Sequence, residues 1–253
     1  IASVLLMNQG LVPAPAGSQG PGPPPILVVG TGILAVGFCF VVNAINLVDV
    51  IHSAGTVFEN LQCSRAATQS FIAGGDTSGI TSRADLELLK DLSDAAQIIT
   101  RAHNSHEQLT PQTIIAINQA MTRSAALQPG VFRSDSDNIG VATRYGDHRP
   151  KAATEADLHS IITEARNQPA DKAAATLFVL LAKAQPFGDG NKRTALLAAN
   201  LLLLPERKIL TVPYSDQDLS VSETFNDLLA RAYIYDDVAA CVEYLVREGV
   251  STL

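Results

Sequence analysis

The chain contains no tryptophan, only two methionines and three cysteines, and aromatic residues make up 5% of its 253 residues. Three widely spaced cysteines form neither a disulfide framework nor a zinc-ligand spacing, so we expect a reducing compartment. The net charge of −7, without a basic stripe that carries interleaved aromatics, disfavours nucleic-acid binding. Alanine and leucine dominate the composition, which favours helices over strands. The cysteines are Cys39, Cys63 and Cys241.

Basic residues are missing from the beginning of the chain, where the first Lys or Arg is Arg65. Residues 1–25 are rich in Gly and Pro, and we expect a disordered leader because such a segment buries too little apolar surface. Residues 26–47 carry no charge, and about twenty such residues cross a bilayer as a helix. This apolar helix is a candidate transmembrane segment. A helix packed on the domain and a stretch foreign to the native protein are the alternatives that stay open.

Beyond residue 48 the apolar residues follow helical spacing, and no long alternating strand pattern is present. Capping residues mark several helix starts, and Pro205 should stop a central apolar helix. The expected N-caps are Ser82, Thr110 and Thr154. The expected later helices span residues 171–184, 191–204, 218–233 and 236–247, and the expected short strands lie near 140–142 and 209–212.

Residues 185–196 read Gln-Pro-Phe-Gly-Asp-Gly-Asn-Lys-Arg-Thr-Ala-Leu, a glycine-rich turn that opens an apolar helix. Gly188 and Gly190 allow the backbone to approach a ligand closely. The first N–H groups of a helix that starts near Asn191 have no partner within that helix and favour an anion. Because a Lys-Arg pair follows, the sequence predicts a phosphate-binding loop.

The ordered set Phe-x-Asp-Gly-Asn-x-Arg resembles the signature of the Fic/Doc (Fido) family, His-x-Phe-x-Asp/Glu-Gly-Asn-Gly/Lys-Arg-x-x-Arg/Leu. The resemblance implies an all-α, Fic-type helical bundle with a short β-hairpin flap, formed by residues 81–253. It also implies ATP as a substrate with Mg²⁺ held by Asp189. The transferred group would be AMP or, in the Doc-like branch, a phosphoryl group, and the partner a protein with a Ser, Thr or Tyr hydroxyl. The implied nucleotide-binding residues are Phe187, Gly188, Gly190, Asn191, Lys192 and Arg193, and the implied catalytic positions are Gln185, Asp189 and Arg193.

Three positions depart from the family pattern. Gln185 replaces the catalytic His, and an amide does not accept a proton, so loss of the general base should cost about 10² to 10⁴ in rate. By the same resemblance Gln185 would hydrogen-bond the target hydroxyl without deprotonating it. Lys192 is a Doc-like feature, and Leu196 replaces the second Arg of adenylylating members. We therefore expect a nucleotide-binding protein with weak or no transferase activity. The alternative is a non-catalytic regulatory or interaction module, such as a toxin–antitoxin component.

The segment from Thr56 to Asn60 resembles the inhibitory motif Ser/Thr-x-x-x-Glu-Gly/Asn that precedes many Fic domains. By this resemblance residues 48–80 form an inhibitory-type helical segment, and Glu59 reaches into the nucleotide site. Its usual partner, the second motif Arg, is absent. We expect Glu59 either to pair with Arg193 or Lys192, or to have no regulatory role.

Residues 129–133, Pro-Gly-Val-Phe-Arg, resemble the segment that precedes the flap, which pairs with a target by main-chain hydrogen bonds. Residues 145–149 are expected to form an exposed loop nearby. The resemblance implies a cytoplasmic Fic-like domain; membrane anchorage through residues 26–47 and homo-oligomerisation stay open. The implied flap residues are Asn138, Ile139, Gly140 and Val141.

Overall fold

The computed structural model describes residues 45–124, 128–137 and 139–253. The expected leader, residues 1–25, and nearly all of the apolar segment 26–47 lie outside the described residues. Residues 45–47 are not helical, and the first described helix begins at Val48. Across the described part of the chain, every helix is too short or too polar to cross a membrane.

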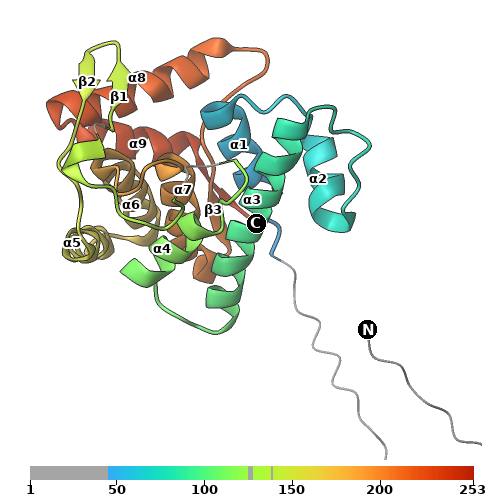
Figure 1. Cartoon of the computed structure of the whole chain (residues 1–253), viewed down its shortest axis with the longest axis horizontal. Coiled ribbons are helices and arrows are strands. Elements are labelled where there is room, and N and C mark those ends of the chain that lie inside the picture. Colours follow the sequence, from blue (N-terminus) through green and yellow to red (C-terminus); the bar gives the residue numbers. More distant parts are fainter. Residues whose placement is uncertain (1–44, 125–127, 138) are drawn as a thin grey trace, which may run out of the picture. The chain divides into compact units, whose positions relative to one another are not determined.

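The described residues fold mainly into α-helices, which confirms the all-α prediction (Figure 1). Four short strands form two separate two-stranded sheets. The helices are α1 (Val48–Glu59), α2 (Arg65–Gly74), α3 (Arg83–Asn104), α4 (Pro111–Gln119), α5 (Glu155–Arg166), α6 (Ala170–Ala184), α7 (Asn191–Leu203), α8 (Leu219–Tyr235) and α9 (Val238–Glu248), with single 3-10 turns η1 (Asp135–Asp137) and η2 (Leu204–Glu206). The strands are β1 (Val141–Thr143), β2 (Gly146–His148), β3 (Lys208–Leu210) and β4 (Val250–Thr252).

Side-chain caps begin three of the helices where the sequence predicts them. The Ser82 hydroxyl accepts a hydrogen bond from the backbone N–H of the third residue of α3. Thr110 and Thr154 form capping boxes at α4 and α5, in which the side chain of the third helical residue returns the hydrogen bond. These caps pair N–H groups that have no acceptor inside the helix, so the helix starts are set locally.

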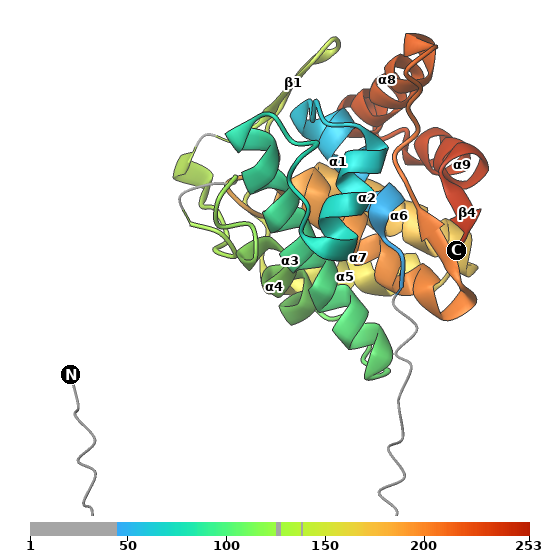
Figure 2. The ribbon, with the colours of Figure 1, turned by 90° about the vertical axis from the view of Figure 1, so that its right-hand side faces the viewer.

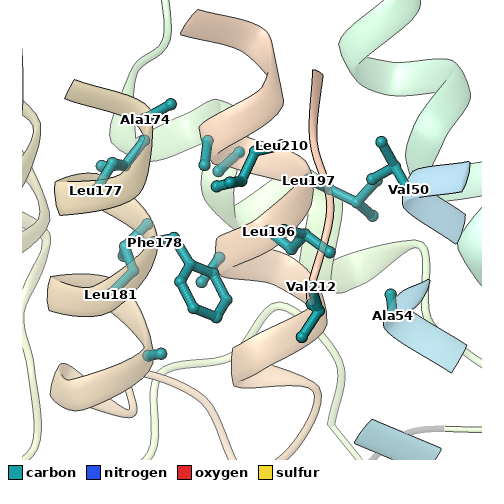
Figure 3. Close-up of a cluster of buried hydrophobic side chains, with 14 of the residues drawn as sticks. Val50, Ala54, Ala174, Leu177, Phe178, Leu181, Leu196, Leu197, Leu210 and Val212 are labelled. Carbon is teal, nitrogen blue, oxygen red and sulfur yellow. The ribbon is translucent and has the colours of Figure 1, made fainter. Parts of the chain in front are cut away.

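The core lies between α6 and α7, the two apolar helices expected at the centre (Figure 1). Phe178 of α6 points toward α7, which carries Leu196, and Val50 of α1 approaches α7 from its other side (Figure 3). Leu181 of α6 belongs to the same buried cluster. All four side chains are essentially inaccessible to solvent. Burying each such side chain contributes about 1.5 to 3 kcal/mol, so the helices on either side of the motif loop are held firmly.

Helices α1 and α2, the segment expected to be inhibitory, pack on the same body (Figure 2). Helix α1 contacts α3 and α7. The Ser53 hydroxyl accepts a hydrogen bond from the N–H of Val212 at 3.2 Å and donates to the carbonyl of Val50. Glu59, the last residue of α1, is thereby placed beside the beginning of α7.

The region after α7 differs from the prediction in two details. Helix α7 ends at Leu203, and Pro205 lies in the turn η2 that follows. The strand expected over residues 209–212 is β3, one residue earlier and shorter, and it pairs with the C-terminal strand β4. A three-residue strand has too little alternation for a sequence pattern. The Asn200 side chain joins β3 to α7 through two hydrogen bonds with the backbone of Leu210, each 2.9 Å long.

The flap is an antiparallel hairpin formed by β1 and β2, in which Val141 pairs with His148. The sequence placed the flap at residues 138–141, whereas the hairpin begins at Val141, and Asn138 lies outside the described residues. The expected loop at residues 145–149 is wrong, because it contains the hairpin turn and all of β2. Gly146 accounts for the turn, since its φ of 123° suits glycine.

Candidate nucleotide-binding site

Gln185, at the position of the family His, ends α6 in a left-handed conformation with φ 47°. Its amide nitrogen donates a hydrogen bond to the carbonyl of Ala182, and its amide oxygen accepts one from Asn191 at 3.1 Å. The residue is buried. These hydrogen bonds use one of the two N–H donors and one of the two lone pairs of the amide and fix its orientation.

Asn191 holds the motif loop in shape. Its side-chain oxygen accepts from the N–H of Phe187, and its side-chain nitrogen donates to the carbonyl of the same residue, both at 2.9 Å. Phe187 is fully buried, and its ring stacks on Phe132 with 5.6 Å between the ring centroids. Phe187 thus anchors the loop in the core.

Arg133 ties the motif loop to the segments on both sides of the flap. Its backbone N–H donates to the carbonyl of Pro186 at 3.0 Å, and its Nε donates to the carbonyl of Gln185 at 2.6 Å. Its Nη2 donates to the carbonyls of Pro150 and Lys151, which follow the hairpin. This buried guanidinium therefore sets the position of the flap relative to the motif.

Helix α7 begins without a side-chain cap. Its N-cap is Gly190, whose φ of 71° is unfavourable for other residues. The carboxylate of Asp189 accepts the N–H of Gly190 at 2.6 Å and lies at the loop surface. The first N–H groups of α7 thus face the loop without a capping side chain, and such groups attract an anion.

Asn118 of α4 is a site residue that the sequence analysis missed. Its side-chain nitrogen donates to the carbonyl of Asp189 and to the hydroxyl of Thr194, each at 3.0 Å. Its side-chain oxygen accepts from the N–H of Gly130 at 2.7 Å. The sequence does carry a signal for this residue, because an amide side chain stands among the apolar residues of α4. Asn118 is almost fully buried there. Buried polar side chains need partners, and here the partners are the motif loop and the segment before the flap.

The two motif cations have different surroundings. Arg193 is almost fully buried, and its Nε lies 2.9 Å from Oε1 of Glu59, so the ion pair expected from the sequence is confirmed. The ammonium of Lys192 lies over the ring of Phe58, 4.9 Å from its centroid. Burial lowers the pKa of Lys192. Burial also raises the pKa of Glu59, and the nearby Arg193 opposes that rise.

Two nitrogens of Arg193 lack hydrogen-bond acceptors among the residues that the structure describes. They are Nε, whose contact with Glu59 is not aligned as a hydrogen bond, and Nη2, which lies 3.7 Å from Oδ1 of Asp189. Together Nε and Nη2 form one edge of the guanidinium, which matches two oxygens of a carboxylate or phosphate. Buried donors without acceptors are rare in proteins, so this edge is suited to an anionic ligand.

The motif loop, the end of α1 and the beginning of the flap surround one cavity of about 200 Å³. The structure therefore brings together most of the site residues that the sequence predicts. Phe187 lies behind the loop in the core. The lining residues are Glu59, Ile139, Gly140, Val141, Gln185, Gly188, Asp189, Gly190, Asn191, Lys192 and Arg193.

A second cavity of about 400 Å³ lies beneath the flap, between the hairpin and α8. It shares Val141 and Lys192 with the motif cavity, so the two adjoin. Tyr233 of α8 lines it; the hydroxyl is buried without an acceptor in the described structure, and burial raises its pKa. No sequence motif marked this cavity, because its walls come from segments far apart in the chain.

The tip of the flap is attached to α8 over this second cavity. Asp227 accepts hydrogen bonds from Nη1 of Arg144 at 2.9 Å and from the hydroxyl of Tyr145 at 2.7 Å. The ring of Tyr145 also meets Tyr235 edge to face, with 5.2 Å between centroids. These contacts hold the hairpin against α8, so the second cavity has a defined roof.

None of the five histidines, all of which lie in the described residues, lines the motif cavity. The ring of His148 stacks on the ring of Tyr233, with 4.8 Å between centroids. Nε2 of His148 is hydrogen-bonded to the carbonyl of Lys183 at 2.7 Å. No histidine is therefore placed to replace the family base.

Asp189 is the predicted magnesium ligand. Its side chain is about half exposed, at 52%, at the mouth of the loop. Mg²⁺ is commonly bound by one or two carboxylates together with substrate phosphates, so a single carboxylate beside the uncapped start of α7 is compatible with this ion. The described residues contain no group of three or more metal-ligating side chains that would hold a metal by themselves.

Comparisons with known proteins agree with this geometry. Residues 108–203 match the family described as the Fic/DOC family. No curated protein matches the chain. Among solved structures, a Fic-domain-containing signaling protein from Bacteroides thetaiotaomicron is similar with a TM-score of 0.59 and 18% identity over 79% of this chain and 81% of that one.

Two further structures cover the same 79% of this chain. One is Fic-1 from C. elegans, residues 134–508, with a TM-score of 0.59 and 15% identity. The other is a Fic family protein from Desulfovibrio desulfuricans, with a TM-score of 0.56 and 17% identity. The chain spans 58% and 61% of their lengths, respectively. At these identities the structures show a shared fold, and the Fic/DOC family model matches the chain over residues 108–203, the part that contains α4 to α7 and the motif loop.

Proposed function

We propose that this domain binds the polyphosphate of a purine nucleoside triphosphate, with ATP as the expected ligand and Mg²⁺ held between the phosphates and Asp189. The observation that carries the proposal is the Nε–Nη2 edge of Arg193 in the motif cavity, whose two nitrogens have no aligned hydrogen-bond acceptor in the described structure. The uncapped start of α7 supplies backbone N–H groups at the same place. Both features stabilise negative charge.

The size of the two cavities supports a nucleotide rather than a free anion. The motif cavity, about 200 Å³, is smaller than the usual range for small-molecule sites, about 300 to 1,000 Å³. It suits phosphates, and the adjoining cavity of about 400 Å³ suits the nucleoside. Lys192 lies between them and would neutralise phosphate charge.

Transfer of AMP or of a phosphoryl group to a protein hydroxyl is proposed to be slow. A general base must lie within hydrogen-bonding reach of the proton that it removes. Gln185 cannot accept that proton, and its amide is already hydrogen-bonded within the motif loop. The protein target would pair with the exposed part of the flap, as extended peptides pair with strand edges.

Titration calorimetry with ATP and Mg²⁺ tests the binding part, with Arg193→Gln as the variant. A hydrogen bond to a charged group contributes about 1.5 to 3 kcal/mol, so the variant should bind about 10- to 100-fold more weakly. Arg247→Gln is the matched control, because Arg247 lies on α9 and contacts Glu248. No heat with ATP or any other purine triphosphate would refute the proposal.

Labelled ATP tests the transfer part. Label at the α-phosphate follows AMP transfer, and label at the γ-phosphate follows phosphoryl transfer. Binding without transfer of either label in the presence of a candidate target would favour the second candidate function, a non-catalytic module such as a toxin–antitoxin component. The internally bonded amide of Gln185 is the observation that favours this alternative.

A further inference from the structure

A buried carboxylate lies next to the motif but outside both cavities. Asp91 of α3 is fully buried, although burying an unpaired carboxylate costs several kcal/mol. Four hydrogen-bond donors from two consecutive residues offset this cost. Arg123 donates from its backbone N–H and from Nη1, both at 2.9 Å. Ser124 donates from its backbone N–H at 2.6 Å and from its hydroxyl at 2.8 Å.

The Ser124 hydroxyl connects this carboxylate to the motif. Nη1 of Arg193 donates a hydrogen bond to Oγ of Ser124 at 3.0 Å. A hydroxyl has one proton and two lone pairs, and a guanidinium has donors only. The hydroxyl proton goes to the Asp91 carboxylate, so Oγ of Ser124 is left as an acceptor for Arg193. The donor-to-acceptor direction of these two hydrogen bonds is thus fixed, from Arg193 through Ser124 to Asp91.

The hydrogen-bond chain from Arg193 through Ser124 to Asp91 holds one corner of the Arg193 guanidinium. The corner is Nη1, opposite the edge formed by Nε and Nη2. Because the guanidinium is planar and rigid, fixing Nη1 also fixes the direction in which that edge points. Glu59 contacts the edge at Nε. If Glu59 moved away, the Ser124 contact would still keep Arg193 in place.

We infer that Asp91 and Ser124 are positioning residues that aim the Nε–Nη2 edge of Arg193 at the phosphate position of the motif cavity. The binding part of this inference rests on the proposed function, whereas the positioning of Arg193 does not. A buried ion pair adds little to stability on balance, so orientation of Arg193 gives the Asp91 carboxylate a role that packing alone does not.

Arginine side-chain ¹H–¹⁵N spectra test the positioning without any nucleotide. The Nε–H resonance of Arg193 is assigned by its loss in Arg193→Lys. We expect this resonance to shift and broaden in Ser124→Ala and in Asp91→Asn, and to stay close to the parent position in Ser124→Thr, which keeps the hydroxyl. Ser160→Ala is the control, because that hydroxyl only bonds within its own helix. An unchanged resonance in Ser124→Ala would overturn the inference.

Affinity for inorganic pyrophosphate is the second measurement. Ser124→Ala should bind pyrophosphate about two- to tenfold more weakly, because the Nε–Nη2 edge of Arg193 is no longer held toward the phosphate position. Ser124→Thr should restore the parent affinity, which a purely structural defect would not do. Equal affinity of Ser124→Ala and the parent would refute the positioning role. If the parent itself binds neither pyrophosphate nor ATP, the proposed function fails, and the spectra alone decide on the positioning. If Asp91→Asn does not fold, Ser124→Ala and Ser124→Thr still decide it.

Discussion

Glu59, at the end of α1, lies with Oε1 2.9 Å from Nε of Arg193, at the beginning of α7. The contact covers the guanidinium edge that otherwise has no acceptor in the described structure. Phe58, the preceding residue, lies beneath the ammonium of Lys192. The last two residues of α1 therefore contact both motif cations. Under the proposed function, a polyphosphate would compete with the Glu59 carboxylate for Arg193.

Replacing Glu59 by Gln should strengthen nucleotide binding. The amide keeps the size of the side chain and removes the charge that competes with phosphate at Arg193. A partly exposed ion pair is worth about 0.2 to 1 kcal/mol, so the affinity for ATP with Mg²⁺ should rise by up to about fivefold. Calorimetry measures it, with Glu87→Gln, which removes a surface ion pair on α3, as the control. A weaker affinity in Glu59→Gln would mean that Glu59 helps to hold the ligand.

The competition should also depend on pH. Burial raises the pKa of Glu59 above its value in the unfolded chain, about 4.3. The carboxyl therefore binds its proton more tightly when folded, and its contribution to stability is full in acid and is lost as the pH rises through the raised pKa. Protonated Glu59 no longer competes for Arg193, so the competition from this side chain should weaken toward acid pH.

The Glu59→Gln variant isolates this effect. Pyrophosphate is also protonated toward acid pH, but this affects its binding to both proteins equally. The affinity of Glu59→Gln divided by that of the parent therefore reports on Glu59 alone. The ratio should fall toward one between about pH 7 and about pH 4 as the parent is protonated. A constant ratio over this range would show that Glu59 does not titrate in contact with Arg193.

Restoring histidine at position 185 should raise group transfer. Gln185 has a φ of 47°, and histidine is among the residues that tolerate the left-handed region. A general base contributes about 10² to 10⁴, and we expect Gln185→His to increase transfer of label from ATP at least about tenfold. Gln185→Asn is the control, since it suits the same backbone but accepts no proton. No gain in the His variant despite normal nucleotide binding would place the defect elsewhere in the site.

Phe187→Ala should destabilise the fold as well as the motif loop. The ring is fully buried and stacked on Phe132, and Phe-to-Ala substitutions in a core cost about 3 to 5 kcal/mol. Chemical denaturation followed by circular dichroism measures the change. Val131→Ala, next to Phe132 and at a side chain that is 52% exposed, should change stability by less than about 0.5 kcal/mol. A similar loss in both variants would show that burial of the Phe187 ring is not the cause.

The fold class and the motif loop were predictable because their signals are local. The capping residues Thr110 and Thr154 start helices through contacts within one turn. The loop between the two central helices also follows from adjacent residues, since Asn191 bonds only to residues of its own motif. By contrast, the hairpin strands and β4 have three residues each, which is too short for a recognisable period.

The amino-acid sequence by itself determined where the helices begin, which helix the motif loop opens and that position 185 holds no base. Only the tertiary structure decided that Glu59 pairs with Arg193, that Asn118 holds the loop and that Asp91 reaches Arg193 through Ser124. The physical reason is distance along the chain. Hydrogen-bond partners within one turn are dictated by local geometry, whereas partners dozens of residues apart meet only after the apolar faces of α3, α4, α6 and α7 have packed.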